Sequence, residues 1–163
     1  MTELPSVYVE TSLLSYLAAR PSSNLIVAGQ QELSRQWWEH RASRYRLFVS
    51  ELVIDESARG NPDAARRRLE MASGLARLDA DDESDSLTEC ILNDGIIPER
   101  AAADAAHIAL AARHNMDFLL TWNCRHIANA TILRHLAELL WRQGYELPVI
   151  CTPNELLGND RDF

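Results

Sequence analysis

Apolar residues along the chain form short β-rich runs that alternate with longer segments of helical spacing. The first run, Ser6–Glu10 (SVYVE), is almost continuously apolar, which is typical of a strand buried in a parallel sheet. Thr11 and Ser12 follow it as candidate N-caps, and the pattern predicts a helix through about Ala18.

The same alternation continues to the end of the chain. Ser50 and Asp63 are candidate N-caps of later helices, and Pro98 is expected as the first residue of another. Further strands are expected at Tyr45–Val49, Ala76–Asp79, Asp117–Thr121 and Pro148–Cys151. Further helices are expected at Leu25–His40, Glu51–Ala58, Ala64–Ser73, about Asp81–Asn93, Pro98–His114, Thr131–Gln143 and Pro153–Leu157.

This order of elements predicts an α/β protein, in which a three-layer α/β/α sandwich surrounds a mostly parallel central sheet. With 163 residues and no interdomain linker, the chain is expected to form one domain over residues 1–163. In such sheets ligands bind outside the carboxyl ends of the strands, where Glu10 and Asn123 are expected.

Several carboxylates occupy helix faces that are otherwise apolar. Glu56 lies four residues after Leu52 and three after Val53, so these side chains share one face, whereas Asp55 lies on a polar face. An inward carboxylate is costly unless it is paired, hydrogen-bonded or bound to a metal. Glu56 is therefore a candidate functional acid.

Asp104 and Glu10 are also acids that lie among apolar positions of their own elements. Asp104 shares an apolar stripe with Ile108 and Ala111, and Glu10 ends an apolar strand. Acids that cluster repel one another unless something positive holds them together. Three costly acids on three separate elements therefore predict convergence on a single cation.

Each acid also has a structural alternative. Glu56 could pair with Arg59 or Arg100, Asp104 could cap a neighbouring element, and Glu10 could be a turn residue. These alternatives stay open at the level of the sequence.

The motifs around these acids resemble those of the PIN-domain family, and within it the VapC-type toxins, from Val7 to about Leu157. The matching segments are Glu10-Thr11-Ser12 after a strand, Ser50 to Glu56, Gly60-Asn61-Pro62, Asp104 to Ala109, Thr121-Trp122-Asn123 and Thr152 to Leu157. Two positions depart from the family pattern: the first acid is Glu10 where Asp is usual, and Asn123 stands where an acid is often found.

The resemblance implies a metal-dependent endoribonuclease that hydrolyses phosphodiester bonds in RNA, as the toxin of a toxin–antitoxin pair. It implies a Mg²⁺ or Mn²⁺ ion held by Glu10, Glu56, Asp104 and Asn123, with Thr11, Ser12 and Thr121 orienting phosphate or water. Its implied partners are an RNA substrate, a cognate antitoxin protein and a second copy of the chain. The amphipathic segment Leu25–His40 is a candidate surface for such a partner.

Two other functions remain open. Glu10 and Asn123 also fit a catalytically silent PIN-like module that binds RNA or protein. An unrelated α/β hydrolase or phosphatase is disfavoured, because the chain has no GxSxG, no Walker A pattern and no DxD after the first strand.

Two histidines and three tryptophans are weaker candidates. His107 and His126 could act as a general acid or a zinc ligand, but His107 is expected to point away from the stripe of Asp104. Trp37, Trp38 and Trp141 could stack on RNA bases, although their helical spacing favours packing or an interface.

Charge, cysteine content and the length of apolar runs exclude several classes of protein. The net charge of −8 argues against broad electrostatic attraction to nucleic acid. Three scattered cysteines exclude a disulfide framework and a cysteine-rich zinc site. Because no apolar run approaches ~20 residues and no secretory signal opens the chain, a cytoplasmic protein without a membrane partner is expected.

Overall fold

Five short parallel strands form the centre of the protein in a computed structural model that describes residues 3–158. In spatial order the strands are β3 (Ala76–Leu78), β2 (Arg46–Ser50), β1 (Ser6–Val9), β4 (Phe118–Leu120) and β5 (Val149–Cys151). The predicted α/β class and parallel sheet are confirmed. The first two and last five residues of the predicted 1–163 domain lie outside the described residues.

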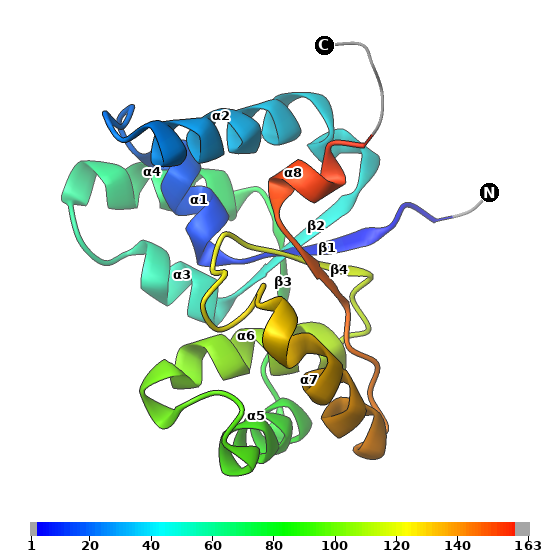
Figure 1. Cartoon of the computed structure of the whole chain (residues 1–163). Helices are drawn as coiled ribbons and strands as arrows, with labels where there is room; N and C mark the ends of the chain where they lie inside the picture. The colour runs from blue at the N-terminus through cyan, green and yellow to red at the C-terminus, as the bar shows by residue number, and fades with distance from the viewer. Residues whose placement is uncertain (1–2, 159–163) are drawn as a thin grey trace.

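Helices cover both faces of this sheet (Figure 1). On one side lie α1, α2, α4 and α8, with α3 packed against α1 and α4, and on the other side lie α5, α6 and α7. The helices are α1 (Thr11–Ala18), α2 (Leu25–His40), α3 (Glu51–Ser57), α4 (Pro62–Ser73), α5 (Asp82–Asp94), α6 (Ala102–Arg113), α7 (Ala130–Arg142) and α8 (Pro153–Leu156). Two 3₁₀ turns, η1 (Ala42–Arg44) and η2 (Glu99–Ala101), complete the described elements.

The central strand is buried on both faces, as its apolar sequence predicts. All four residues of β1 are buried, and Tyr8 is paired in register with Phe48 of β2 and Leu119 of β4. The alanine-rich α6 packs closely because small side chains such as Ala105 and Ala109 are fully buried. Sheet and helices therefore share one apolar cluster.

The strand order reverses direction at the middle of the sheet. From β1 the chain builds outward through β2 to β3, and it then crosses over to β4 and β5 on the other side of β1. In open parallel sheets, such a reversal leaves a crevice outside the carboxyl ends of the two central strands. The fold thus places the residues that follow β1 and β4 at the edge where ligands bind in proteins of this architecture.

Three predicted helix starts differ from the structure. Glu10, not Thr11 or Ser12, is the N-cap of α1: its backbone is still extended, and its side chain accepts the hydrogen bond from the N–H of Ser12. Asn61, not Asp63, caps α4, with Pro62 as the first helical residue. Pro98 precedes the 3₁₀ turn η2 and does not begin α6 itself.

Among residues 3–158, no helix combines the length and apolar character that a membrane span needs.

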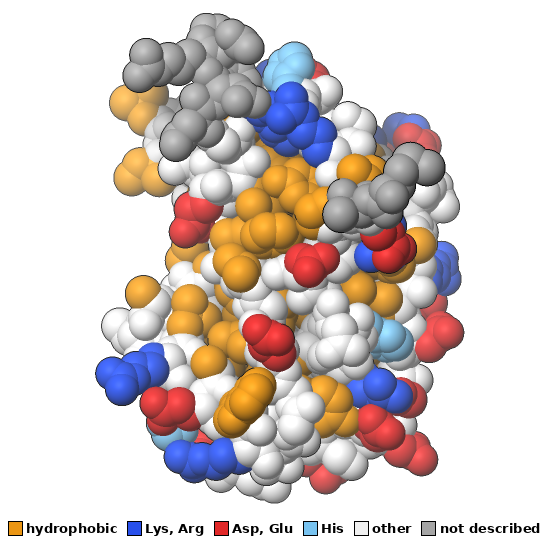
Figure 2. Space-filling model, turned by 90° about the vertical axis from the view of Figure 1, so that its right-hand side faces the viewer, with side chains coloured by type: hydrophobic (Ala, Val, Ile, Leu, Met, Phe, Trp, Pro, Cys, Tyr) orange, Lys and Arg blue, Asp and Glu red, His pale blue; other side chains and the backbone are white. Residues whose placement is uncertain are grey.

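The amino ends of the strands lie at the edge of the sheet opposite their carboxyl ends. Figure 2 views the molecule from this side, where β1 begins. Apolar side chains gather in the middle of this view, and a hollow at this edge is lined by Pro5, Met116, Phe118 and Leu147. This hollow lies away from the acids that the sequence singles out. Glu10, which the sequence singles out, instead follows β1 at the carboxyl edge of the sheet.

A polar clasp joins β1 to β4 at the amino edge. The carboxylate of Asp117 accepts hydrogen bonds from the N–H of Ser6 at 2.7 Å and from its hydroxyl at 2.9 Å. These two bonds hold the pKa of Asp117 below its ordinary value, and the charge of Arg46 adds to them against the opposing effect of burial. The clasp therefore stabilises the fold only while Asp117 is ionised.

We predict that Asp117→Asn lowers the free energy of unfolding at neutral pH, because it weakens the two hydrogen bonds from Ser6. The loss should be at most about 1 kcal/mol, since solvent screens this exposed group. Since the folded pKa is depressed, the contribution is present above the unfolded pKa of about 3.9 and is lost as the pH falls through the folded value. Urea unfolding of both proteins between about pH 7 and pH 3 should show the difference narrowing at the acid end. A difference that does not change with pH would contradict this account.

Candidate metal centre

Glu10 lies directly after β1, at the carboxyl edge of the sheet. Its backbone N–H still donates to Leu120 of β4 at 3.1 Å, so the strand pairing fixes its position. Its Oε2 accepts hydrogen bonds from the N–H of Ser12 at 3.1 Å, from the hydroxyl of Ser12, and from the hydroxyl of Thr121 at 2.7 Å. Only 5% of Glu10 is exposed. The carboxylate is thus buried but well supplied with donors.

Glu56 reaches the same place from α3. Ser50 ends β2 and caps α3 through a hydrogen bond from the N–H of Val53, which aims the helix across the carboxyl edge. Oε1 of Glu56 accepts hydrogen bonds from the hydroxyl of Thr11 at 2.6 Å and from Nε2 of His107 at 2.6 Å. The predicted inward position of Glu56 is confirmed, since it is half-buried, whereas Asp55 is exposed.

The environment of Glu56 favours its ionised form. Burial by itself raises the pKa of this carboxyl, but the hydrogen bond and charge of His107, the Thr11 hydroxyl and the charge of Arg59 together hold the pKa below its ordinary value.

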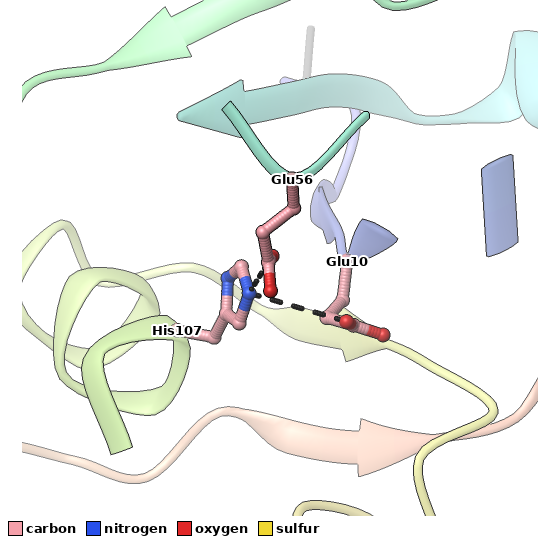
Figure 3. A group of neighbouring side chains, drawn as sticks. All are labelled: Glu10, Glu56 and His107. Atoms are coloured by element: carbon pink, nitrogen blue, oxygen red, sulfur yellow. Dashed lines mark hydrogen bonds and ion pairs between the residues drawn. The ribbon is translucent and has the colours of Figure 1, made fainter. Parts of the chain in front are cut away.

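His107 is the third member of this group and comes from α6. It is fully buried, and its Nε2 lies 2.6 Å from Oε1 of Glu56 and 3.9 Å from Oε1 of Glu10. Figure 3 shows the three side chains converging from β1, α3 and α6. Ligand atoms of Glu10, Glu56 and His107 all lie within 4.8 Å of one another. We refer to these three residues as the central group.

Asp104 and Asn123 lie in a second group, centred on the loop after β4. Oδ2 of Asp104 lies 2.9 Å from Nδ1 of His126, and Oδ1 of Asn123 accepts a hydrogen bond from the N–H of His126 at 3.1 Å. The hydroxyl of Thr121 joins the two groups, because it accepts from the N–H of Asn123 at 2.9 Å and donates to Glu10. Of the three predicted acids, the structure brings Glu10 and Glu56 together, and it places Asp104 beside His126.

His107 was expected to point away from Asp104, and that expectation is wrong. Three residues along an α-helix rotate by about 300°, so the two side chains lie only ~60° apart on one face. The spacing Asp104-x-x-His107 is therefore a signal that the sequence carries, and it links the two groups through α6.

The arginine alternatives do not account for the site. No ion pair among residues 3–158 joins Glu10, Glu56 or Asp104 to an arginine. Arg59 influences the pKa of Glu56 through its charge alone. Since the donors to Glu10 and Glu56 are hydroxyls, an amide and an imidazole, the central group has room for a further positive charge.

The central group has the chemistry of a divalent-metal site. Carboxylate oxygens are the usual ligands of Mg²⁺ and Mn²⁺, and imidazole nitrogen is a frequent ligand of transition metals. Hydroxyls of Thr11, Ser12 and Thr121 hold the two carboxylates in place, as supporting partners do in metal sites. The residues present therefore fit one divalent ion.

Comparisons with known proteins bear on the fold. No protein-family model and no curated protein matches the chain. Among solved structures, VapC20 of Mycobacterium tuberculosis, a sarcin–ricin loop cleaving toxin, aligns with a TM-score of 0.58 and 13% identity over 74% of this chain and 92% of VapC20. VapBC2 of Rickettsia felis, solved with a DNA fragment from its promoter, aligns with a TM-score of 0.55 and 13% identity over 90% and 97% of the two chains.

The chain has the fold of the VapC-type PIN-domain proteins. The resemblance that the motifs predicted is thus confirmed at the level of the fold. In this VapC-like fold, the motif residues that follow β1, β2 and β4 gather at one edge of the sheet, where the central group lies.

We predict that a divalent ion stabilises the protein through the central group. With Mn²⁺ at about 100 times its dissociation constant, the free energy of unfolding should rise by about 2.7 kcal/mol, because the ion binds the folded state alone. Thermal unfolding with Mn²⁺ and with EDTA measures this effect for wild type, Glu10→Gln and Glu56→Gln.

Both variants should lose most of the stabilisation by Mn²⁺. The matched control is Asp55→Asn, which removes an exposed acid next to Glu56 on the same helix and should keep it. An equal response of Glu56→Gln and Asp55→Asn would mean that Mn²⁺ binds elsewhere.

Proposed function

We propose that the chain is a metal-dependent endoribonuclease that hydrolyses phosphodiester bonds in RNA, as the toxin of a toxin–antitoxin pair. The observation that carries this proposal is the central group, two carboxylates and an imidazole at the carboxyl edge of a VapC-like sheet. Proteins of this fold include VapC20, a toxin that cleaves the sarcin–ricin loop.

Glu10 and Glu56 are the residues that would hold a Mg²⁺ or Mn²⁺ ion. Such an ion would neutralise phosphate charge and provide an activated water for attack on phosphorus. The hydrolysis adds water across one P–O bond, and the leaving oxygen takes up a proton.

Nearby hydroxyls hold the carboxylates of Glu10 and Glu56 in position. Thr11 donates to Glu56, while Ser12 and Thr121 donate to Glu10, so each carboxylate keeps one geometry before any ligand arrives. The hydroxyl of Ser12 also accepts the N–H of Trp122 at 2.8 Å, which ties the loop after β4 to the start of α1. Fixed geometry of this kind lowers the cost of organising a site during the reaction.

Asp104 and Asn123 are proposed to complete the site from the side of β4. Both are members of the matching motifs, and Thr121 connects their loop to Glu10. Asp104 would contribute a third carboxylate, and Asn123 would shape the loop through its bond to the N–H of His126. This assignment rests on the resemblance together with the Thr121 link.

RNA and an antitoxin protein are the partners that this function requires. The VapBC2 complex of Rickettsia felis, to which the chain is similar in fold, supports an antitoxin partner. Leu25 and Ile26, at the start of α2, are 88% and 75% exposed and could meet such a partner. A homodimer and a cytoplasmic location stay predictions.

We predict that the purified chain cleaves RNA with Mg²⁺ or Mn²⁺ and that EDTA abolishes the cleavage. Glu56→Gln and Asp104→Asn should each reduce the rate by roughly 10–100-fold or more, since each alters the proposed metal site. Gel analysis of a structured RNA measures the rate, with Asp55→Asn as the matched control.

The two results that would overturn the proposal are distinct. Cleavage that persists at the same rate in Glu56→Gln would indicate a contaminating nuclease. Absence of cleavage in the presence of bound Mn²⁺ would favour the catalytically silent PIN-like module.

A further inference from the structure

His107 uses both of its ring nitrogens, and its partners differ in kind. Nδ1 lies 2.7 Å from the hydroxyl of Tyr8, and Nε2 lies 2.6 Å from the carboxylate of Glu56. Tyr8 is fully buried on β1, and its hydroxyl also lies 2.7 Å from the hydroxyl of Ser50. An imidazole at the centre of a metal site thus connects to a buried pair of hydroxyls.

The partners determine which nitrogen carries hydrogen. An ionised Glu56 only accepts hydrogen bonds, so Nε2 of His107 must donate to it. In the neutral ring Nδ1 then accepts from the hydroxyl of Tyr8, and Tyr8 accepts from Ser50. The hydroxyl of Ser50 in turn accepts from the N–H of Val53 at 3.4 Å. A directed chain of donors therefore runs from α3 through β2 and β1 into the central group.

The direction of these hydrogen bonds can reverse, because a hydroxyl can both donate and accept a hydrogen bond. In the other neutral tautomer Nδ1 carries the hydrogen and donates to the hydroxyl of Tyr8, and Tyr8 in turn donates to Ser50. The lone pair of Nε2 then faces the oxygens of Glu10 and Glu56. Burial keeps the Tyr8 hydroxyl protonated, since it raises the pKa of Tyr8 far above the ordinary range.

We propose that His107 is a direct ligand of the divalent ion through Nε2, and that the site consequently prefers first-row transition ions such as Mn²⁺ to Mg²⁺. Tyr8 is the positioning residue: its hydroxyl accepts a hydrogen bond from Nδ1–H of His107 while Nε2 binds the ion. This inference rests on the metal site of the proposed function. Its physical reason is that Mg²⁺ prefers oxygen ligands and retains its waters, whereas imidazole nitrogen suits transition ions.

The first test is pulsed electron paramagnetic resonance of Mn²⁺ bound to the full chain. Wild type should show modulation from a directly bound nitrogen, and His107→Asn should lose it. His126→Gln removes a second imidazole at the same edge of the sheet and should keep the signal. Oxygen-only coordination in wild type, or loss of the signal in His126→Gln alone, would overturn the proposal.

The second test measures affinity by calorimetry with Mn²⁺ and with Mg²⁺. Wild type should bind Mn²⁺ at least about tenfold more tightly than Mg²⁺, because of the nitrogen ligand. Tyr8→Phe keeps the buried ring but removes the hydroxyl, and it should weaken Mn²⁺ binding by roughly 10–100-fold while changing Mg²⁺ binding less. Equal affinity of wild type for the two ions would contradict the assignment.

These measurements use no RNA, so the two proposals can fail separately. A nitrogen signal without RNA cleavage would overturn the nuclease function and support His107 as a ligand. Cleavage with oxygen-only Mn²⁺ would do the reverse. Should His107→Asn fail to fold, the nitrogen signal must persist in His126→Gln and weaken in Tyr8→Phe for the proposal to stand.

Discussion

Burial of two carboxylates side by side is the constraint on which this site depends. Glu10 and Glu56 come from separate elements, and each would be destabilising in an apolar setting without compensation. The structure compensates the two carboxylates with hydrogen bonds from three hydroxyls, one backbone N–H and the imidazole of His107. These donors bond to one oxygen of each carboxylate, Oε2 of Glu10 and Oε1 of Glu56, and they leave the negative charge of the pair without a cationic partner among residues 3–158 other than His107.

The strand order explains why these groups meet. Since β1 lies between β2 and β4, the residues that follow these three strands share one edge of the sheet. Ser50 at the end of β2, Glu10 after β1 and Thr121 after β4 are all buried, and each makes hydrogen bonds that cross between elements. The polar contacts therefore both build the site and close the edge of the core.

Much of the fold follows from local pattern. Continuous apolar runs marked the buried strands, and the face of Leu52 and Val53 placed Glu56 inward while leaving Asp55 exposed. Helix starts were less accurate, because Glu10 and Asn61 compete with neighbouring residues that are also good caps. Which candidate caps a helix depends on how the preceding strand directs the chain, and this information is not local.

The site was predictable in part for a similar reason. Strand ends and helix faces identify Glu10 and Glu56, but the pairing of Asp104 with His126 depends on the path of the loop after β4. His107 lies on the same face of α6 as Asp104, so helical geometry alone would have marked it. Its link to Tyr8 spans 99 residues of sequence and could only come from the assembled sheet.

The two departures from the family pattern, Glu10 and Asn123, lie in different groups of residues. Oε2 of Glu10 accepts the N–H of Ser12 at the start of α1, while Oε1 lies 3.9 Å from Nε2 of His107. Asn123 is neutral and bonds within its own loop, and Asp104 lies beside His126. Two carboxylates therefore remain in the central group, and their charge balances that of one divalent ion. His107 adds a donor atom without adding negative charge, so a second cation would find no further compensation there. On electrostatic grounds, the central group by itself therefore favours one divalent ion, and the negative charge for a second would have to come from Asp104.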